Sequence, residues 1–212
     1  MSMIKILIVD DHAIVREGLK QIVGETSDMF VAGEASNGQQ ALELVRKGNW
    51  EVVLLDIAMP GRGGMDTLKE LKLERPELPV LVLSMYPEEQ YAVRALKAGA
   101  DGYLTKESAP EELISAIRKV SGGGKYVSTS LAEKLATHLA KGKEKPAHEI
   151  LSDREYQVML MIASGMTVGE IADTLSLSVK TISTNRTRMM NKMGMKNNGE
   201  IIHYAIKQGL VD

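Results

Sequence analysis

The sequence predicts an α/β domain, a doubly wound five-stranded parallel sheet with helices on both faces, followed by a second domain made only of helices. Up to about residue 120, short runs of Ile, Val and Leu alternate with amphipathic segments. Such near-continuous apolar runs are typical of parallel strands that are buried on both faces. From residue 150 onward the pattern is helical throughout, and a polar segment containing Pro and Gly separates the two parts.

In the first part, five apolar runs are expected to form strands, and the amphipathic segments after them are expected to form helices. The strands are predicted at 4–9, 30–35, 52–55, 79–83 and 102–104, and the helices at 13–25, 38–47, 64–74, 87–98 and 109–120. Repeats of this length imply right-handed crossovers, which give a doubly wound sheet. Residues 37–40 (Asn-Gly-Gln-Gln) and 108–111 (Ser-Ala-Pro-Glu) resemble capping boxes, which mark the starts of two helices.

Three Gly residues at 122–124 end this alternation. A weaker amphipathic pattern at 128–140 predicts one more helix, and the polar segment 141–146, which contains Gly and Pro, is typical of a linker. The predicted domains are therefore residues 1–123 and 148–212, joined by a linker at 124–147 that contains a helix.

The last part is expected to hold three or four short helices. Capping boxes are predicted at 152–155 and 167–170, with a third at 197–200, and Gly165 is expected to end the first of these helices. The second helix has one apolar face, made by Val168, Ile171, Ala172 and Leu175. A turn at 175–178 leads into the third helix, and two short helices joined in this way have helix-turn-helix spacing.

The composition limits the class of protein. Cys is absent, which excludes disulfides and thiolate metal sites and fits a reducing cytosol. No apolar run approaches the roughly 18–20 residues that span a bilayer, and the first residues lack the pattern of a signal peptide. We therefore expect a cytoplasmic protein with no membrane association. The formal net charge of −2 alone gives no indication of a nucleic-acid partner.

Polar side chains follow four of the predicted strands. Asp10 and Asp11 follow the first strand, Asp56 the third, Ser84 the fourth and Lys106 the fifth. In an open parallel sheet, ligands bind beyond the carboxyl ends of the strands, so these side chains are expected at one edge. Any one of them alone is more often a cap or a surface residue, but their joint placement favours a site.

Three carboxylates at one edge repel one another, and a hard cation such as Mg²⁺ removes that repulsion. Lys106 offers a positive charge and Ser84 a hydroxyl in the same cleft. The chemistry that uses this set is phosphoryl transfer to a carboxylate. Asp56 is expected to be the nucleophile, with Lys106 and Ser84 holding the phosphoryl group.

Residues 4–120 resemble a receiver domain of the CheY type, which has the flavodoxin-like fold. The matching stretches are 6–12 (Ile-Leu-Ile-Val-Asp-Asp-His), 52–61 (Val-Val-Leu-Leu-Asp-Ile-Ala-Met-Pro-Gly), 82–84 (Val-Leu-Ser) and 98–106 (Ala-Gly-Ala-Asp-Gly-Tyr-Leu-Thr-Lys). The resemblance implies that a sensor histidine kinase phosphorylates Asp56. It also implies that Mg²⁺ is bound by Asp10, Asp11, Asp56 and the backbone carbonyl of Ala58.

By the same resemblance, Ser84 and Tyr103 form a switch pair, in which Ser84 moves to the phosphoryl group and the Tyr103 ring turns inward. Ser84 replaces the more usual Thr, and Glu107 stands where Pro commonly follows the Lys; neither change damages the site. Loss of the phosphoryl group needs a positioned water. Because Ala58 and Tyr86 do not obviously orient one, slow dephosphorylation is expected.

The third helix of the second domain carries an exposed polar stripe of Lys180, Thr184, Thr187 and Asn191, opposite an apolar arc of Val179, Ile182, Met189, Met190 and Met193. Residues 179–199 include five basic residues and no acidic one. Periodicity alone fits any amphipathic helix, but this stripe also fits the major groove of DNA. The predicted DNA contacts are Lys180, Ser183, Thr184, Arg186, Thr187, Arg188 and Lys192; the Arg186 stem lies in the apolar arc.

The whole segment from 151 onward resembles the LuxR/FixJ-type DNA-binding domain. The matching stretches are 151–155 (Leu-Ser-Asp-Arg-Glu), 165–172 (Gly-Met-Thr-Val-Gly-Glu-Ile-Ala), 177–182 (Leu-Ser-Val-Lys-Thr-Ile), 191–194 (Asn-Lys-Met-Gly) and 206–210 (Ile-Lys-Gln-Gly-Leu). Asn185 replaces a usual His, and Gly169 a Lys or Asn. The resemblance implies double-stranded DNA as a partner and a homodimer on paired half-sites, with the last helix (198–208) at the dimer contact.

Two alternatives remain open. One is a doubly wound hydrolase that forms an aspartyl phosphate, but the position of its acid/base carboxylate, two residues after the nucleophile, is Ala58 here. The other is a constitutive DNA-binding protein with a degenerate receiver, against which the complete acidic site argues. The sequence does not identify the kinase, the operator, activation or repression, or the receiver surface that dimerises.

Overall fold

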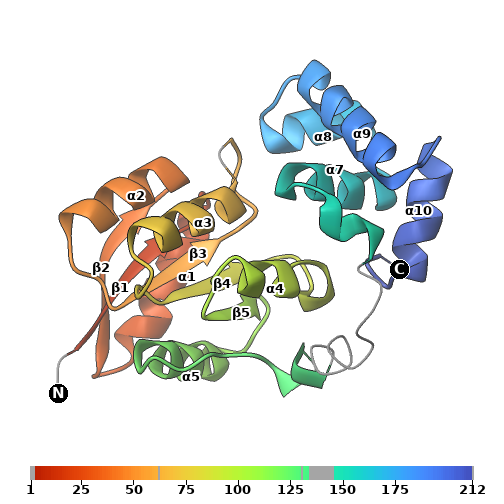
Figure 1. Ribbon diagram of the computed structural model, residues 1–212. Helices are drawn as coiled ribbons and strands as arrows, with labels where there is room; N and C mark the ends of the chain where they lie inside the picture. Colours follow the sequence, from red (N-terminus) through yellow and green to blue (C-terminus); the bar gives the residue numbers. More distant parts are fainter. Residues whose placement is uncertain (1–2, 62, 130, 134–145, 212) are drawn as a thin grey trace. The chain divides into compact units, whose positions relative to one another are not determined.

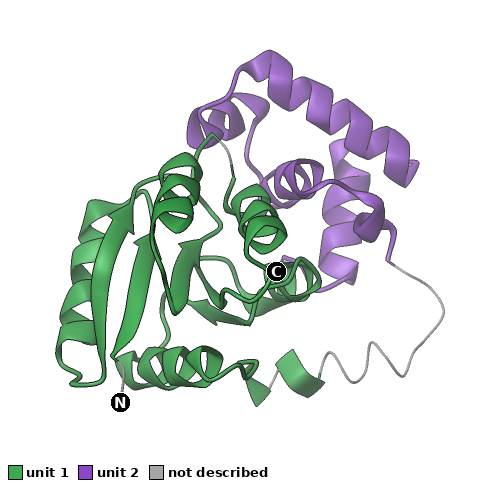
Figure 2. Ribbon diagram, turned by 60° about the vertical axis from the view of Figure 1, so that its left-hand side comes forward, with its two compact units in different colours: residues 1–137 green, residues 138–212 purple. Residues whose placement is uncertain are grey.

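The protein is described from a computed structural model, for residues 3–61, 63–129, 131–133 and 146–211. The chain forms two compact units, Met1–Thr137 and His138–Asp212 (Figure 2). The division between them lies inside the segment that the sequence assigns to a linker. Within the described residues, no helix has both the length and the apolar surface that crossing a membrane requires.

The first unit is a doubly wound α/β sheet (Figure 1). Its elements are β1 (Ile4–Val9), α1 (Ala13–Gly24), β2 (Met29–Ala35), α2 (Gly38–Lys47), β3 (Val52–Asp56), α3 (Gly64–Glu74), β4 (Val80–Ser84), α4 (Glu88–Lys97), β5 (Gly102–Thr105) and α5 (Pro110–Ser121). All strand pairs are parallel, in the order β2-β1-β3-β4-β5. The predicted fold class is confirmed, because the strand order reverses beside β1, as in a flavodoxin-like sheet.

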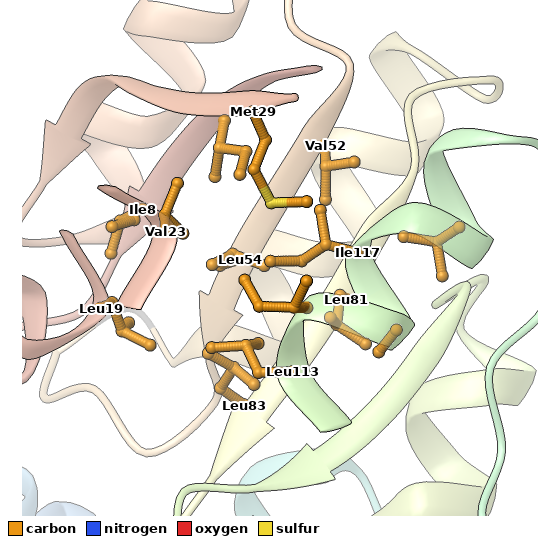
Figure 3. Close-up of a cluster of buried hydrophobic side chains, with 14 of the residues drawn as sticks. Ile8, Leu19, Val23, Met29, Val52, Leu54, Leu81, Leu83, Leu113 and Ile117 are labelled. Carbon is orange, nitrogen blue, oxygen red and sulfur yellow. The ribbon is translucent and has the colours of Figure 1, made fainter. Parts of the chain in front are cut away.

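One hydrophobic core of this unit lies between the sheet and the two helices α1 and α5. Ile8, Leu54 and Leu83 on the strands are buried together with Leu113 and Ile117 on α5, and α1 adds further apolar side chains (Figure 3). Truncating one such side chain to Ala lowers the free energy of unfolding by about 2–5 kcal/mol. Packing in this layer therefore holds the strands in place, and with them the polar residues at the strand ends.

Two predicted helix starts differ in detail from the structure. Asn37 caps α2 by accepting a hydrogen bond from the Gln40 amide, but the Gln40 side chain accepts from Ser36 instead of closing the box. The predicted box at Ser108 is wrong, because α5 has Ala109 as its N-cap and Pro110 in its first turn. Proline lacks an N–H and has a helical φ, so it favours the first helical position and moves the start by one residue.

The chain after α5 does not leave the first unit at once. Tyr126 forms a parallel bridge with Gly102 on β5, and Thr129 and Leu131–Glu133 are helical. The predicted helix at 128–140 is therefore present in its described part, and its remainder lies outside the described residues. Residues 141–145 of the predicted linker also lie outside them.

The second unit is all helical, as predicted. It contains η1 (Ala147–Ile150), α7 (Asp153–Ala163), α8 (Val168–Leu175), α9 (Val179–Met193) and α10 (Asn198–Lys207). The capping boxes that begin α7 and α8 are confirmed, and Gly165 follows α7 with a φ of 89°. Asn197 caps α10, but Glu200 accepts from the amide of Lys196, so the third box is incomplete.

Candidate functional site

The register of the sheet brings the predicted polar residues to one edge. Asp56 pairs with Leu83 at the end of β3, and Ser84 pairs with Thr105 at the end of β4, while Asp10 follows the last residue of β1. Asp56 is 1% exposed and Ser84 is fully buried. The start of α3 lies close behind, because a Cβ on Gly64 would be only 2.1 Å from the Asp56 backbone oxygen.

Lys106 reaches the two most buried carboxylates. Its Nζ lies 2.7 Å from Asp56 Oδ2 and 2.6 Å from Asp10 Oδ2. The other Asp56 oxygen, Oδ1, accepts a hydrogen bond from the Ala58 amide at 2.8 Å. Both oxygens of the predicted phosphoacceptor are therefore held in place before any phosphoryl group arrives.

Burial and charge act differently on the two members of this pair. Burial raises the pKa of Asp56, and the opposing effects of the Lys106 charge and hydrogen bonds only reduce the rise. Burial alone would lower the pKa of Lys106, but the neighbouring Asp56 and Asp10 carboxylates outweigh it, so that pKa is raised. Lys106 is thus a persistent positive charge in the cleft.

The residues around β1 provide a set of oxygen ligands that fits a hard cation. Ligand atoms of Asp10, Asp11, His12 and Asp56 all lie within 4.8 Å of one another. Asp11 Oδ1 is buried and accepts no hydrogen bond from the described residues, and His12 Nδ1 lies 3.1 Å from it. A carboxylate oxygen left this way is costly unless a cation completes its surroundings, so the donor set fits Mg²⁺.

His12 is a member of this cluster that sequence reasoning missed. Its Nδ1 lies 3.1 Å from Asp11 Oδ1 and 3.3 Å from Asp10 Oδ1, and its backbone amide donates to Asp10 Oδ1 at 2.8 Å. The only sequence signal was its place directly after the two Asp residues. The hydrogen bond from the His12 amide to Asp10 does not depend on the orientation of the His12 ring.

Arg16 was also missed, because its role depends on contacts from α1 to the loop before it and to β2. Its Nη1 donates to the Asp10 backbone oxygen at 2.8 Å, and its Nε lies 3.1 Å from Glu34 Oε2 on β2. Lys20 reaches the same Glu34 carboxylate at 2.9 Å. These contacts hold the turn that carries the Asp pair.

Ser84 and Tyr103 are linked through one backbone residue. The Ser84 hydroxyl accepts from the Tyr86 amide at 3.0 Å, and the Tyr103 hydroxyl donates to the Tyr86 backbone oxygen at 2.7 Å. The Tyr103 ring is fully buried, and this burial raises the pKa of its hydroxyl far above the usual range. The ring therefore already has the inward position that the predicted switch assigns to it.

In the second unit, α9 presents the predicted polar stripe to solvent. Ile182, Met189 and Met190 are buried, whereas Val179, at the end of the predicted apolar arc, is 55% exposed. The exposed predicted contacts are Lys180, Ser183, Thr184, Thr187, Arg188 and Lys192, and Arg186 is partly buried. The hydroxyls of Thr184 and Thr187 donate to backbone oxygens one turn earlier, at 2.8 Å and 2.9 Å.

Two of the predicted DNA contacts are engaged inside the unit. Lys192 Nζ lies 2.7 Å from Glu155 Oε2, and Arg186 Nε donates to Asn198 Oδ1 at 2.9 Å. The Glu155 side chain is buried, which would raise its pKa, but the hydrogen bonds from Lys192 and Ser152 outweigh burial and the pKa is lowered. Lys192 therefore has a structural role independent of any DNA.

Comparison with known proteins agrees with both halves of the chain. Residues 6–118 match the family model described as response regulator receiver domain, and residues 149–205 match that of bacterial regulatory proteins, luxR family. Response regulator UvrY of Escherichia coli K12 is 37% identical over 209 residues, covering 98% of this chain and 96% of that protein. Response regulator GacA of Pseudomonas aeruginosa is 37% identical over 211 residues, or 99% of each chain.

Solved structures give the same result. A structure of the Salmonella typhimurium response regulator RcsB has a TM-score of 0.71 at 27% identity, covering 98% of this chain and 99% of that one. A structure of an RcsB–DNA complex has a TM-score of 0.60, also at 27% identity, covering 97% and 98%.

Proposed function

The chain belongs to the two-component response regulators with a LuxR-type DNA-binding domain, and we propose that it controls transcription through phosphorylation of Asp56 by a sensor histidine kinase. The observation that carries this proposal is the geometry at the strand ends. Lys106 Nζ lies within 2.7 Å of both Asp56 and Asp10, and beside them Asp11 keeps a buried oxygen without a hydrogen bond.

In the proposed step, a carboxylate oxygen of Asp56 attacks the phosphorus of a phosphohistidine. The P–N bond breaks, the histidine nitrogen leaves with the bonding electrons, and an acyl phosphate remains on Asp56. Lys106 forms an ion pair with the Asp56 carboxylate before the transfer. Its ammonium group is close enough to pair with the phosphoryl oxygens afterwards. The buried Ser84 hydroxyl can donate to the same oxygens after it leaves the Tyr86 amide.

Asp10, Asp11 and Asp56 would hold Mg²⁺, together with the backbone carbonyl of Ala58. The cation supplies charge neutralisation for the transferring phosphoryl oxygens. His12 and Arg16 fix the Asp10 backbone and carboxylate from two sides, so they position a ligand without binding the substrate.

The chain is a phosphoacceptor and not a catalytic enzyme, as its response-regulator relatives indicate. The second residue after Asp56 is Ala58, which has no group to move a proton to or from water. Tyr86 is the second residue after Ser84, and its ring packs on that of Tyr91, with 4.8 Å between the centroids. Because neither Ala58 nor Tyr86 orients a water for attack on the phosphoryl group, we expect slow dephosphorylation.

The second unit is proposed to bind double-stranded DNA as a homodimer, with α9 in the major groove. The exposed Lys180, Thr184 and Thr187 support base contacts, and Arg188 supports a phosphate contact. The similar protein RcsB has been solved in complex with DNA, which favours the same use of this unit. A kinase partner and a DNA target of this kind place the protein in the cytoplasm.

Mass spectrometry of the intact chain tests the phosphoacceptor directly. The wild type, Asp56→Asn and, as a matched control, Asp66→Asn, which changes an exposed acid in the first turn of α3, are treated with acetyl phosphate and Mg²⁺. The wild type and the control should gain one phosphoryl group, and Asp56→Asn should gain none. Equal labelling of Asp56→Asn would assign the phosphoryl group to another residue and overturn the proposal.

A further inference from the structure

The segment after α5, which we call the strap (residues 125–129 and 131–133), covers the edge strand of the sheet. The Tyr126 amide donates to the Asp101 backbone oxygen at 2.8 Å, and Tyr126 forms a parallel bridge with Gly102. A Cβ on Gly102 would lie 2.9 Å from the Tyr126 oxygen, so the glycine permits this close approach. The strap therefore covers the edge of the sheet at the start of β5, where an open edge would expose backbone hydrogen-bonding groups.

The first end of the strap is held by several contacts. The Tyr126 hydroxyl donates to Glu112 Oε1 on α5 at 2.8 Å, and Lys125 Nζ lies 2.7 Å from Asp101 Oδ1. Burial and the Glu112 carboxylate raise the pKa of Tyr126 to about 12, so its hydroxyl remains a donor at neutral pH. Asp101 is itself fixed by Lys72 at 2.6 Å.

The second end is attached to α4 through the side chain of Ser128. The Ser128 hydroxyl donates to Glu88 Oε2 at 2.5 Å, and Ser128 Oγ itself accepts a hydrogen bond from the Leu131 amide at 3.0 Å. The Ala132 amide donates to the Ser128 backbone oxygen at 3.0 Å, and Leu131 is 1% exposed. Ser128 thus both caps the helical turn of the strap and attaches that turn to Glu88.

Glu88 is close in the chain to the loop that carries Ser84. Tyr86, two residues before Glu88, donates its amide to Ser84 Oγ and accepts the Tyr103 hydroxyl on its backbone oxygen. Glu88 is the first residue of α4. A displacement of Ser84 that breaks the Tyr86 contact therefore acts on the segment that positions the Glu88 carboxylate.

We propose that the attachment of the strap depends on the state of the phosphorylation site through the Ser128–Glu88 hydrogen bond. The proposal rests on the proposed function, since the signal is phosphorylation of Asp56. When Ser84 moves to the phosphoryl group, the Ser128 end is released, while the Tyr126 end stays on β5. The strap directly precedes the chain that leads to the second unit, so the state of the site changes the point at which that chain leaves the receiver.

Backbone hydrogen exchange of the full chain tests this inference. The amides of Leu131 and Ala132 report the Ser128 end, and the Tyr126 amide reports the other end. With acetyl phosphate and Mg²⁺, the first two should exchange about tenfold faster, the loss expected for one charge-assisted hydrogen bond, and Tyr126 should not change. Asp56→Asn should show no change at any of the three.

Variants separate the strap contact from helix capping in general. Ser128→Ala and Glu88→Ala should give the fast exchange without a phosphodonor, and Ser128→Thr, which keeps the hydroxyl, should restore slow exchange. The matched controls are Ser121→Ala at the end of α5 and Glu89→Ala, which removes an acid from the same first turn of α4. Both should behave as the wild type.

The intact mass, recorded on the same samples, separates the two possible failures. A phosphoryl group on Asp56 with unchanged exchange at Leu131 and Ala132 would overturn the strap proposal alone. Fast exchange at Tyr126 as well would also overturn it, because the whole segment would then be opening. Absence of the phosphoryl group would overturn the proposed function and the strap's role with it.

Discussion

Lys106 Nζ lies 2.7 Å from Asp56 Oδ2, so the positive charge of the site is already in contact with the proposed nucleophile. The same amine contacts Asp10, and both carboxylates are almost fully buried. Removing one partner of a buried ion pair leaves the other charge without compensation. This relationship makes Lys106 important for stability as well as for phosphoryl transfer.

Lys106→Met is therefore expected to lower the free energy of unfolding of the first unit by about 3 kcal/mol at neutral pH. Urea unfolding of the full chain, followed by the fluorescence of Trp50, measures it. Mg²⁺ should restore part of the loss, because it replaces the missing positive charge. Unchanged stability without Mg²⁺ would mean that Lys106 does not compensate the carboxylates.

Asp11→Asn should fold normally but bind Mg²⁺ at least about tenfold more weakly, because it removes the carboxylate whose buried oxygen has no hydrogen bond. Mg²⁺ at 100 times its Kd should stabilise the wild type by about 2.7 kcal/mol. Thermal unfolding at a series of Mg²⁺ concentrations gives both affinities, with Asp66→Asn as an acid-removing control. Equal affinity of Asp11→Asn and wild type would exclude Asp11 from the metal site.

Arg188 and Lys192 are expected to behave differently although both were predicted to contact DNA. Arg188→Ala should weaken DNA binding on all sequences and reduce the salt slope of log K by about 0.9. Lys192→Ala should mainly destabilise the second unit, since it leaves Glu155 buried without its Lys. Binding isotherms at several salt concentrations, with hydrogen exchange of α7, distinguish the two. If Lys192→Ala lowers the salt slope without changing the stability of the second unit, Lys192 contacts a DNA phosphate and this prediction is wrong.

Glu155 gives the second unit a predictable pH dependence. Its pKa in the folded chain is lowered, so the ionised carboxylate contributes stability above the unfolded pKa of about 4.3. That contribution is lost as the pH falls through the folded value. Glu155→Gln should therefore be less stable than the wild type at pH 7, and the two should converge as the pH falls below the lowered pKa of Glu155 in the folded chain. Hydrogen exchange of α7 and α9 measures the stability of both proteins across this pH range. A stability difference that does not change with pH would contradict the prediction.

The sequence predicts most of this fold because the boundaries carry strong local signals. The ranges for β1, α2 and α3 match the structure at both ends. In β1 an apolar run stops at two acidic residues, and α2 starts after an Asn cap. Ser108 misled the prediction of α5, since Pro110 determines the first turn more strongly than a possible capping hydroxyl.

Contacts between distant segments were the part that could not be predicted. Glu155 and Lys192 are 37 residues apart, and Ser128 and Glu88 are 40 apart. Nothing in periodicity or composition relates such residues, because the tertiary packing alone brings them together. As a result, Lys192 was interpreted only as a DNA contact, and the segment after α5 was interpreted as a linker with a helix at 128–140, without its contacts to β5 and α4.

DNA affinity of the full chain with and without a phosphoryl group on Asp56 tests the central proposal most directly. The DNA is a sequence selected from a random library by the phosphorylated protein, and the salt concentration is held constant. With acetyl phosphate and Mg²⁺, the wild type should bind this DNA at least about fivefold more tightly, and Asp56→Asn should show no change. Equal affinity in both states, with phosphorylation verified by mass, would contradict control of DNA binding by Asp56.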